Sequence, residues 1–116
     1  MSNKEFYIEN QLNKAIKYGQ CRNYTQAIKI LEPLAVEFTI KCPKIMLYLG
    51  RAYHAIKDFS LAISAFHTYL AINSYDASAW FFLGRSYLAM DLYKKACSAF
   101  SKSLQIKPNS CQTLAL

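Results

Sequence analysis

The chain has 116 residues, of which 53% are hydrophobic and only 3 are glycine and 3 proline, a composition typical of one densely packed, helix-rich domain. No apolar run approaches the roughly 20 residues that span a bilayer, and residues 1–10 lack the basic flank and unbroken apolar stretch of a secretory signal. The net charge of +7 favours acidic proteins, nucleic acid or anionic lipid as partners without choosing among them. We therefore expect a single domain over residues 1–116, intracellular and cytoplasmic, with no membrane span.

Two helices are predicted in the N-terminal third of the chain. The first covers residues 6–18 and is expected to end at Gly19, because glycine commonly follows the last turn of a helix. The second begins at about Tyr24 and contains Pro33, which has no N–H to donate to the helix. We therefore expect this second helix to be kinked or shortened.

Two further helix pairs are predicted downstream, at residues 44–56, from the following turn to about 72, 78–90 and 93–106. Asp58 or Ser60 is the expected N-cap of the second helix in the middle pair, and Asp91 that of the second helix in the last pair. Side chains of these types accept hydrogen bonds from the free N–H groups of a first helical turn. Pro108 should prevent the last helix from continuing.

An internal repeat underlies these pairs. Residues 43–76 and 77–110, aligned without a gap, share 11 identical residues, whereas chance gives roughly two or three. A weaker copy runs over residues 8–42, and residues 111–116 have the character of the start of a fourth unit or a capping segment. The sequence therefore predicts an all-α stack of about three helix-turn-helix units.

The repeated residues are those that allow two helices to approach closely. Gly50 and Gly84 remove a side chain where the first helix of a pair meets the second, and Ala62 and Ala96 do the same from the other side. Large residues between them fill the space from one hairpin to the next. The full set of motif positions is Leu49, Gly50, Tyr53, Ala62, Phe66, Trp80, Leu83, Gly84, Tyr87, Ala96, Phe100 and Pro108.

This spacing, Trp-x2-Leu-Gly-x2-Tyr followed by Ala-x3-Phe and Pro, resembles the tetratricopeptide repeat family over residues 8–110. The resemblance implies a right-handed α-α superhelical solenoid whose first helices form a concave surface. It also implies a non-enzymatic protein-protein interaction module that acts as an adaptor or assembly scaffold.

The chain departs from the family pattern in several places. Gln11 and Lys14 stand where the first unit should carry apolar core residues, and Ser74 replaces the terminal proline of the middle unit. One subgroup of the family grips the acidic C-terminal tails of the large cytosolic heat-shock chaperones with a clamp of Lys, Asn and Arg. The corresponding positions here carry Leu12, Ile16, Tyr48, Ser78 and Phe82, so the clamp is absent and a co-chaperone role of this type is not expected.

A stripe of side chains on the first helices of the last two pairs is the predicted binding surface. Residues at i, i+4 and i+7 share one face of a helix, and Arg51 and Arg85 are one 34-residue repeat apart. Such a stripe suits an extended or helical peptide that carries a carboxylate or phosphate beside apolar groups. The expected groove residues are Lys44, Leu47, Tyr48, Arg51, His54, Phe81, Arg85 and Leu88, with Phe82 at the margin.

Catalysis, cofactors and metals have no support in the sequence. There is no Gly-rich phosphate loop and no nucleophile signature, and the four cysteines have no zinc-ligand spacing. We therefore predict no enzyme activity, no cofactor and no metal site.

Four alternatives remain open at this stage. The two arginines could be solvated or paired with acidic residues of their own repeat. The chain could bind RNA, as some helical-repeat proteins do, although its last basic residues lie mostly off the groove. It could also belong to a longer array within a complex, or self-associate through the apolar edge at Leu114 and Leu116.

Overall fold

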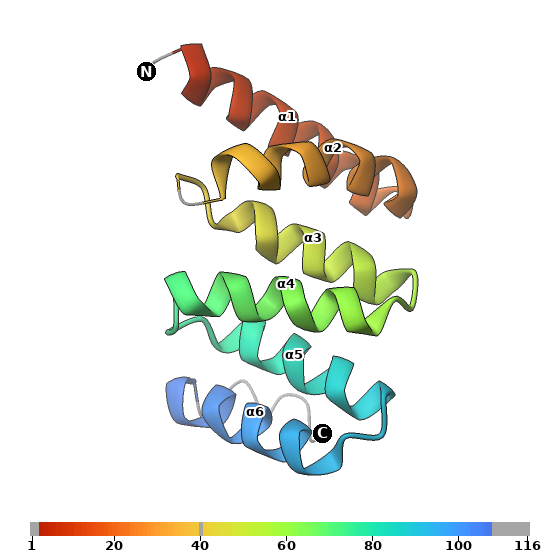
Figure 1. Ribbon diagram of the computed structural model, residues 1–116, viewed down its shortest axis with the longest axis vertical. Helices are drawn as coiled ribbons and strands as arrows, with labels where there is room; N and C mark the ends of the chain where they lie inside the picture. Colours follow the sequence, from red (N-terminus) through yellow and green to blue (C-terminus); the bar gives the residue numbers. More distant parts are fainter. Residues whose placement is uncertain (1–2, 40, 108–116) are drawn as a thin grey trace.

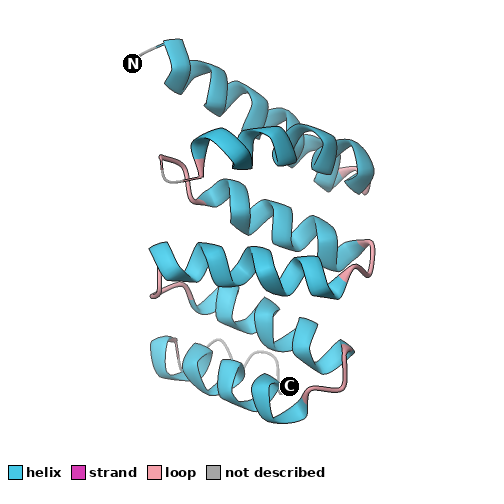
Figure 2. Cartoon of the chain, viewed as in Figure 1, coloured by secondary structure: helices cyan, strands magenta, loops and turns pink. Residues whose placement is uncertain are grey.

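The computed structural model describes residues 3–39 and 41–107, so the predictions for Pro108 and for residues 111–116 lie outside the described residues. Helices and loops make up the whole of this described part (Figure 2). Its helices are α1 (Asn3–Gln20), α2 (Tyr24–Phe38), α3 (Lys44–Ala55), α4 (Phe59–Ile72), α5 (Ala77–Ala89) and α6 (Tyr93–Ile106). The prediction of an all-α helical repeat solenoid is confirmed.

The six helices form a stack of three hairpins, in which each helix packs on the next one along the chain (Figure 1). We call α1, α3 and α5 the A helices and α2, α4 and α6 the B helices. Neighbouring A helices also contact one another, whereas neighbouring B helices of this described stack do not. The stack therefore curves with the A helices on its inner side.

The turn inside each hairpin uses a left-handed residue that is not glycine. Arg22, Lys57 and Asp91 have φ values of 63°, 68° and 60°. In each turn the N–H of the following residue donates to a carbonyl five positions earlier, over 2.8 to 2.9 Å, the pattern of a Schellman motif. The predicted end at Gly19 is therefore wrong, because α1 continues through Gly19 and Arg22 is the left-handed residue.

Two predictions about helix caps have different outcomes. Asp58 is the N-cap of α4, and its side chain accepts from the N–H of Leu61 at 3.5 Å. Asp91 is not the N-cap of α6, because it occupies the left-handed turn position and the cap falls on Leu92. The Asp91 carboxylate instead accepts from the hydroxyl of Tyr93 at 3.0 Å.

Pro33 does not shorten its helix. α2 has 15 residues, against 14 in each of α4 and α6, and it runs on from Pro33 to Phe38. Pro33 and Lys29, whose carbonyl loses its helical partner, are both exposed. Water can solvate that carbonyl on the exposed side, which reduces the cost of the lost hydrogen bond.

Inside each of the last two hairpins, an aromatic ring of the B helix lies against the backbone of the A helix. A Cβ atom at Gly50 would lie 2.8 Å from Cε1 of Phe66, and one at Gly84 would lie 2.7 Å from Cε1 of Phe100. Both distances are too short for a real Cβ contact. Phe66 is fully buried, whereas Phe100 is partly buried and so has more freedom to move.

Two motif tyrosines connect neighbouring hairpins at equivalent points. The hydroxyl of Tyr53 on α3 donates to Oε2 of Glu32 on α2. The hydroxyl of Tyr87 on α5 shares a hydrogen bond with Nε2 of His67 on α4. Each bond joins an A helix to the B helix before it, and both supplement the apolar packing between hairpins.

Gly50→Ala is expected to destabilise the protein by about 1–2 kcal/mol, because the overpacking of Phe66 outweighs the higher helix propensity of alanine. Gly84→Ala should cost less, because the ring of Phe100 can shift toward solvent. The measurement is the free energy of unfolding from urea titration followed by circular dichroism.

Gly19→Ala is the matched control, because nothing lies within 4 Å of a Cβ atom at this helical position. It should stabilise the protein by about 0.5–1 kcal/mol through helix propensity alone. Equal effects of the three substitutions would contradict the role assigned to the two rings.

Candidate functional site

The predicted groove residues all lie on α3 and α5, at the inner side of the stack. The structure brings Tyr48, Arg51 and His54 together around one pocket. Phe81 and Arg85 lie next to each other on α5, outside that pocket. The remaining three, Lys44, Leu47 and Leu88, do not line it.

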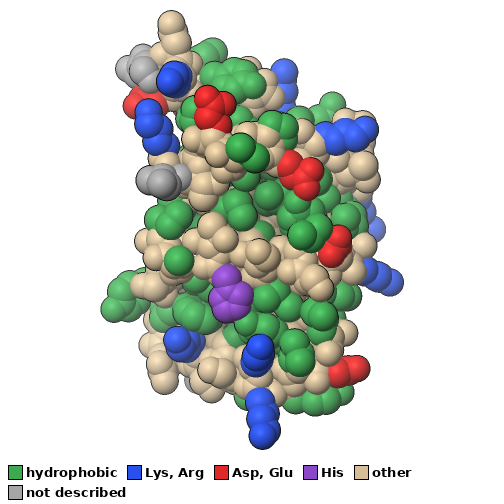
Figure 3. All heavy atoms as spheres, in the orientation of Figure 1, with side chains coloured by type: hydrophobic (Ala, Val, Ile, Leu, Met, Phe, Trp, Pro, Cys, Tyr) green, Lys and Arg blue, Asp and Glu red, His purple; other side chains and the backbone are tan. Residues whose placement is uncertain are grey.

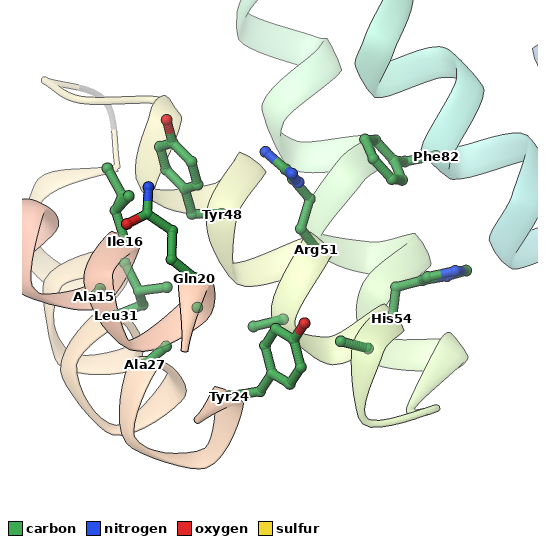
Figure 4. Close-up of a pocket in the computed structure, with 13 residues that line it drawn as sticks. Ala15, Ile16, Gln20, Tyr24, Ala27, Leu31, Tyr48, Arg51, His54 and Phe82 are labelled. Atoms are coloured by element: carbon green, nitrogen blue, oxygen red, sulfur yellow. The ribbon is translucent and has the colours of Figure 1, made fainter. Parts of the chain in front are cut away.

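A hollow of about 450 Å³ lies between the first two hairpins and reaches α5 (Figure 4). Five of its lining residues are alanine or glycine, so the helices that surround it leave space that larger side chains would fill. We call it the inter-hairpin pocket. Its lining residues are Ala15, Ile16, Gly19, Gln20, Tyr24, Ala27, Leu31, Tyr48, Arg51, Ala52, His54, Ala55 and Phe82.

Arg51 stands at the rim of the inter-hairpin pocket between two aromatic rings. Its Cζ atom lies 5.1 Å from the ring centroid of Phe82 and 6.0 Å from that of Tyr48, and Figure 4 shows the two rings on either side of the arginine. Both distances are within the range of cation–π attraction. The ring of Phe82 in turn stacks on the ring of the buried Phe66, with the two centroids 6.1 Å apart and an interplanar angle of 12°. This packing restricts its movement.

Arg85 is the repeat equivalent of Arg51 but has a different surrounding. Its Cζ atom lies 5.8 Å from the ring centroid of Phe81, the only ring that it contacts in the described part of the chain. Phe81 in turn packs on Phe100, with ring centroids 5.6 Å apart. The two equivalent arginines are therefore held to different degrees.

The inner surface formed by α3 and α5 has no acidic residue of its own, because neither helix contains Asp or Glu. Arg51 and Arg85 are both exposed. Within residues 3–39 and 41–107, neither guanidinium has an acidic partner. Their charge is thus directed to solvent, and not to a carboxylate of the same repeat.

His54 links the second and third hairpins beside the two arginines. Its Nδ1 atom shares a hydrogen bond of 3.0 Å with Oγ of Ser86, which is fully buried. The imidazole also meets the ring of Phe59 edge-on at 5.2 Å. Burial, and then the nearby charge of Arg85, lower the pKa of His54 below its usual 6.5. The imidazole is therefore neutral at neutral pH, and the positive charge of this surface comes from the arginines.

Sequence reasoning missed the contribution of the first hairpin to the pocket. Ile16, Gln20 and Tyr24 line it, yet none of them is among the predicted groove residues. A signal was present, because the 35-residue offset of the first unit places Ile16 at the position equivalent to Arg51. Phe82, expected only at the margin, is the ring closest to Arg51.

The lysines near the C-terminal end of the described chain lie on the B helix α6 or directly after it. Lys94, Lys95 and Lys102 of α6 are exposed, and so is Lys107, the C-cap that follows it. The Nζ atom of Lys102 lies 4.6 Å from the ring centroid of Trp80, and that of Lys95 lies 5.8 Å from the ring centroid of Tyr87. Figure 3 shows Lys and Arg side chains at the α5–α6 end of the molecule.

No group of three or more His, Cys, Asp or Glu residues in the described ranges could hold a metal ion. Among the helices that the structure describes, none has the length and apolar character to cross a membrane.

Comparisons with known proteins point to one family. The family model described as tetratricopeptide repeat matches residues 77–110. The crystal structure of MamA is similar over 87% of this chain, with a TM-score of 0.83 and 29% sequence identity, and the chain spans 58% of the MamA chain. No curated protein sequence matches the chain.

A second solved structure is the first TPR of Spaghetti (RPAP3), bound to the HSP90 peptide SRMEEVD. The similarity covers 85% of this chain and 78% of the Spaghetti (RPAP3) chain, with a TM-score of 0.81 and 22% sequence identity. At this identity the likeness shows the shared fold.

The lowered pKa of His54 predicts that the protein becomes less stable as the pH falls. The unfolded chain takes up the proton more readily than the folded one, so stability that is complete above about pH 6.5 is lost as the pH drops through that value toward the folded pKa. Urea unfolding at about pH 7.5 and about pH 5.5 measures the difference.

His54→Gln should reduce this acid-side loss, because glutamine keeps a polar group near Ser86 and does not titrate. His67→Gln, which removes the chain's other histidine, controls for the loss of an imidazole. An unchanged pH dependence in His54→Gln would show that His54 does not cause it.

Proposed function

We propose, from its fold and from the family match of residues 77–110, that the chain is a tetratricopeptide repeat protein and a non-enzymatic interaction module. It holds a peptide or helix of a partner protein against the inner surface of its A helices and acts as an adaptor or assembly scaffold. Its intracellular, cytoplasmic location stays a prediction.

The observation that carries this proposal is the unbalanced charge of the inner surface. Arg51 and Arg85 are exposed on helices that contain no acidic residue, and aromatic rings flank them. A surface of this kind attracts an acidic segment and offers apolar area beside the charge. The Spaghetti (RPAP3) structure supports the same mode of action at the level of the fold, because it holds a peptide.

Nucleic acid is a weaker candidate for the same chain. The exposed lysines of α6 lie on a B helix, whereas Arg51 and Arg85 lie on the A helices α3 and α5. Self-association and membership of a longer array remain predictions.

Affinity capture from a lysate of the source organism tests the proposal, with both proteins and nucleic acids identified. The wild-type chain is compared with the double variant Arg51→Glu/Arg85→Glu. We expect a partner protein to be retained by the wild type and lost by the double variant, because two attractive charges become repulsive. Circular dichroism should show unchanged helicity.

The double variant Lys29→Glu/Lys94→Glu is the matched control, because it makes the same change in net charge at exposed positions of α2 and α6. It should retain the partner. Loss of the partner in both double variants would point to net charge alone, and recovery of nucleic acid only would overturn the proposal.

A further inference from the structure

We propose, building on the interaction function above, that Arg51 and the inter-hairpin pocket form one two-part subsite. Arg51 binds the carboxylate of an Asp or Glu in the partner segment. The pocket takes an apolar side chain that neighbours this acidic residue. The partner is thus an acidic peptide segment with an apolar anchor, and the anchor enters between the first two hairpins.

The first part rests on how Arg51 is held. Rings on both sides, at 5.1 and 6.0 Å from Cζ, restrict the guanidinium before any ligand arrives. Attraction to the ring faces leaves the N–H groups at the edge of the guanidinium available to other partners. A carboxylate is planar and accepts two parallel N–H bonds from arginine, so it matches this edge.

The second part rests on the shape and chemistry of the pocket. Its volume of about 450 Å³ falls within the range of roughly 300–1,000 Å³ that is usual for ligand pockets. Its inner walls are mostly apolar, with Leu31 and Ala27 from α2 and Ala52 from α3, all of them buried in the stack. An apolar side chain is therefore its natural occupant, because a charged group would lose its hydration there.

The position of Arg51 at the rim joins the two parts. Arg51 and Ala55 lie one turn apart on α3, and both are exposed lining residues of the pocket. The rim of the pocket therefore includes the arginine, so an acidic residue next to a ligand side chain in the pocket can come within its reach. Arg85, which has one ring beside it and does not line the inter-hairpin pocket, should contribute less.

A library of random 12-residue peptides, displayed on phage, tests the subsite by selection on the wild-type chain. We expect the selected peptides to carry Asp or Glu within two positions of a Leu, Ile, Phe or similar residue. For a synthetic peptide from this set, replacement of the acidic residue by its amide should weaken binding about 10-fold or more, as loss of a charge-assisted pair does. Fluorescence polarisation measures the dissociation constant.

Variants of the protein then assign the two parts. Arg51→Gln should weaken the acidic peptide about 10-fold and the amide peptide little, so that the two changes are not additive. Arg85→Gln should have a smaller effect. Ala55→Phe, which fills the pocket from its exposed rim, should weaken binding while the preference for the acidic peptide remains.

The outcomes separate this inference from the proposed function. Peptides that bind in an Arg51- or Arg85-dependent way but show no enrichment of acid beside an apolar residue would overturn the subsite and leave the interaction function standing. The subsite would also be overturned, and the interaction function left standing, if Arg51→Gln and the replacement of the acidic residue by its amide weakened binding additively. If no selected peptide responds to any variant of the inner surface, both proposals fail. Lys94→Gln, on the exposed face of α6, is the control that should leave every affinity unchanged.

Discussion

The close approach of a phenylalanine ring to a glycine backbone is the constraint on which the groove depends. The ring of Phe66 on α4 occupies the place that a Cβ atom at Gly50 would need, and its stacked neighbour is Phe82 of the next hairpin. Phe82 in turn lies 5.1 Å from the guanidinium of Arg51. A contact inside one hairpin therefore fixes the ring that orients a charge on the inner surface, because a close-packed core passes on small displacements.

The same contact in the third hairpin leads to a different result. Phe100 lies against Gly84 and packs on Phe81, and Phe81 is the ring beside Arg85. These four residues all belong to the third hairpin. The corresponding contacts at Arg51 run from Gly50 and Phe66 in the second hairpin to Phe82 in the third. Two arginines at identical positions in the repeat thus differ in how firmly they are held, because the surroundings of a repeat include its neighbour.

Local and periodic features were predictable from the sequence, and features that depend on several hairpins were not. Helix positions followed from the 34-residue repeat, and the cap of α4 was narrowed to Asp58 or Ser60, of which Asp58 is the cap, because a capping side chain acts within its own turn. Asp91 was wrongly predicted to be the N-cap of α6. It occupies the left-handed turn position of its hairpin, as Lys57 does in the preceding hairpin, and more than one residue type can adopt that backbone conformation. The inter-hairpin pocket was missed because side chains of three hairpins line it, and their relative placement is a property of the whole stack.

The polar links between hairpins show how the stack can stay rigid while the inner surface stays open to a ligand. Tyr53 and Tyr87 occupy one repeat position and each reaches back to the preceding B helix, where Glu32 and His67 are equivalent partners of different chemistry. Burial raises the pKa of both hydroxyls, so both are neutral at neutral pH. These bonds join A to B helices and involve neither Arg51 nor Arg85. The bonds of Tyr53 and Tyr87 therefore contribute to the register between hairpins, whereas the charge of the groove comes from Arg51 and Arg85. His54, which bonds Ser86 of the third hairpin and lines the inter-hairpin pocket, takes part in both.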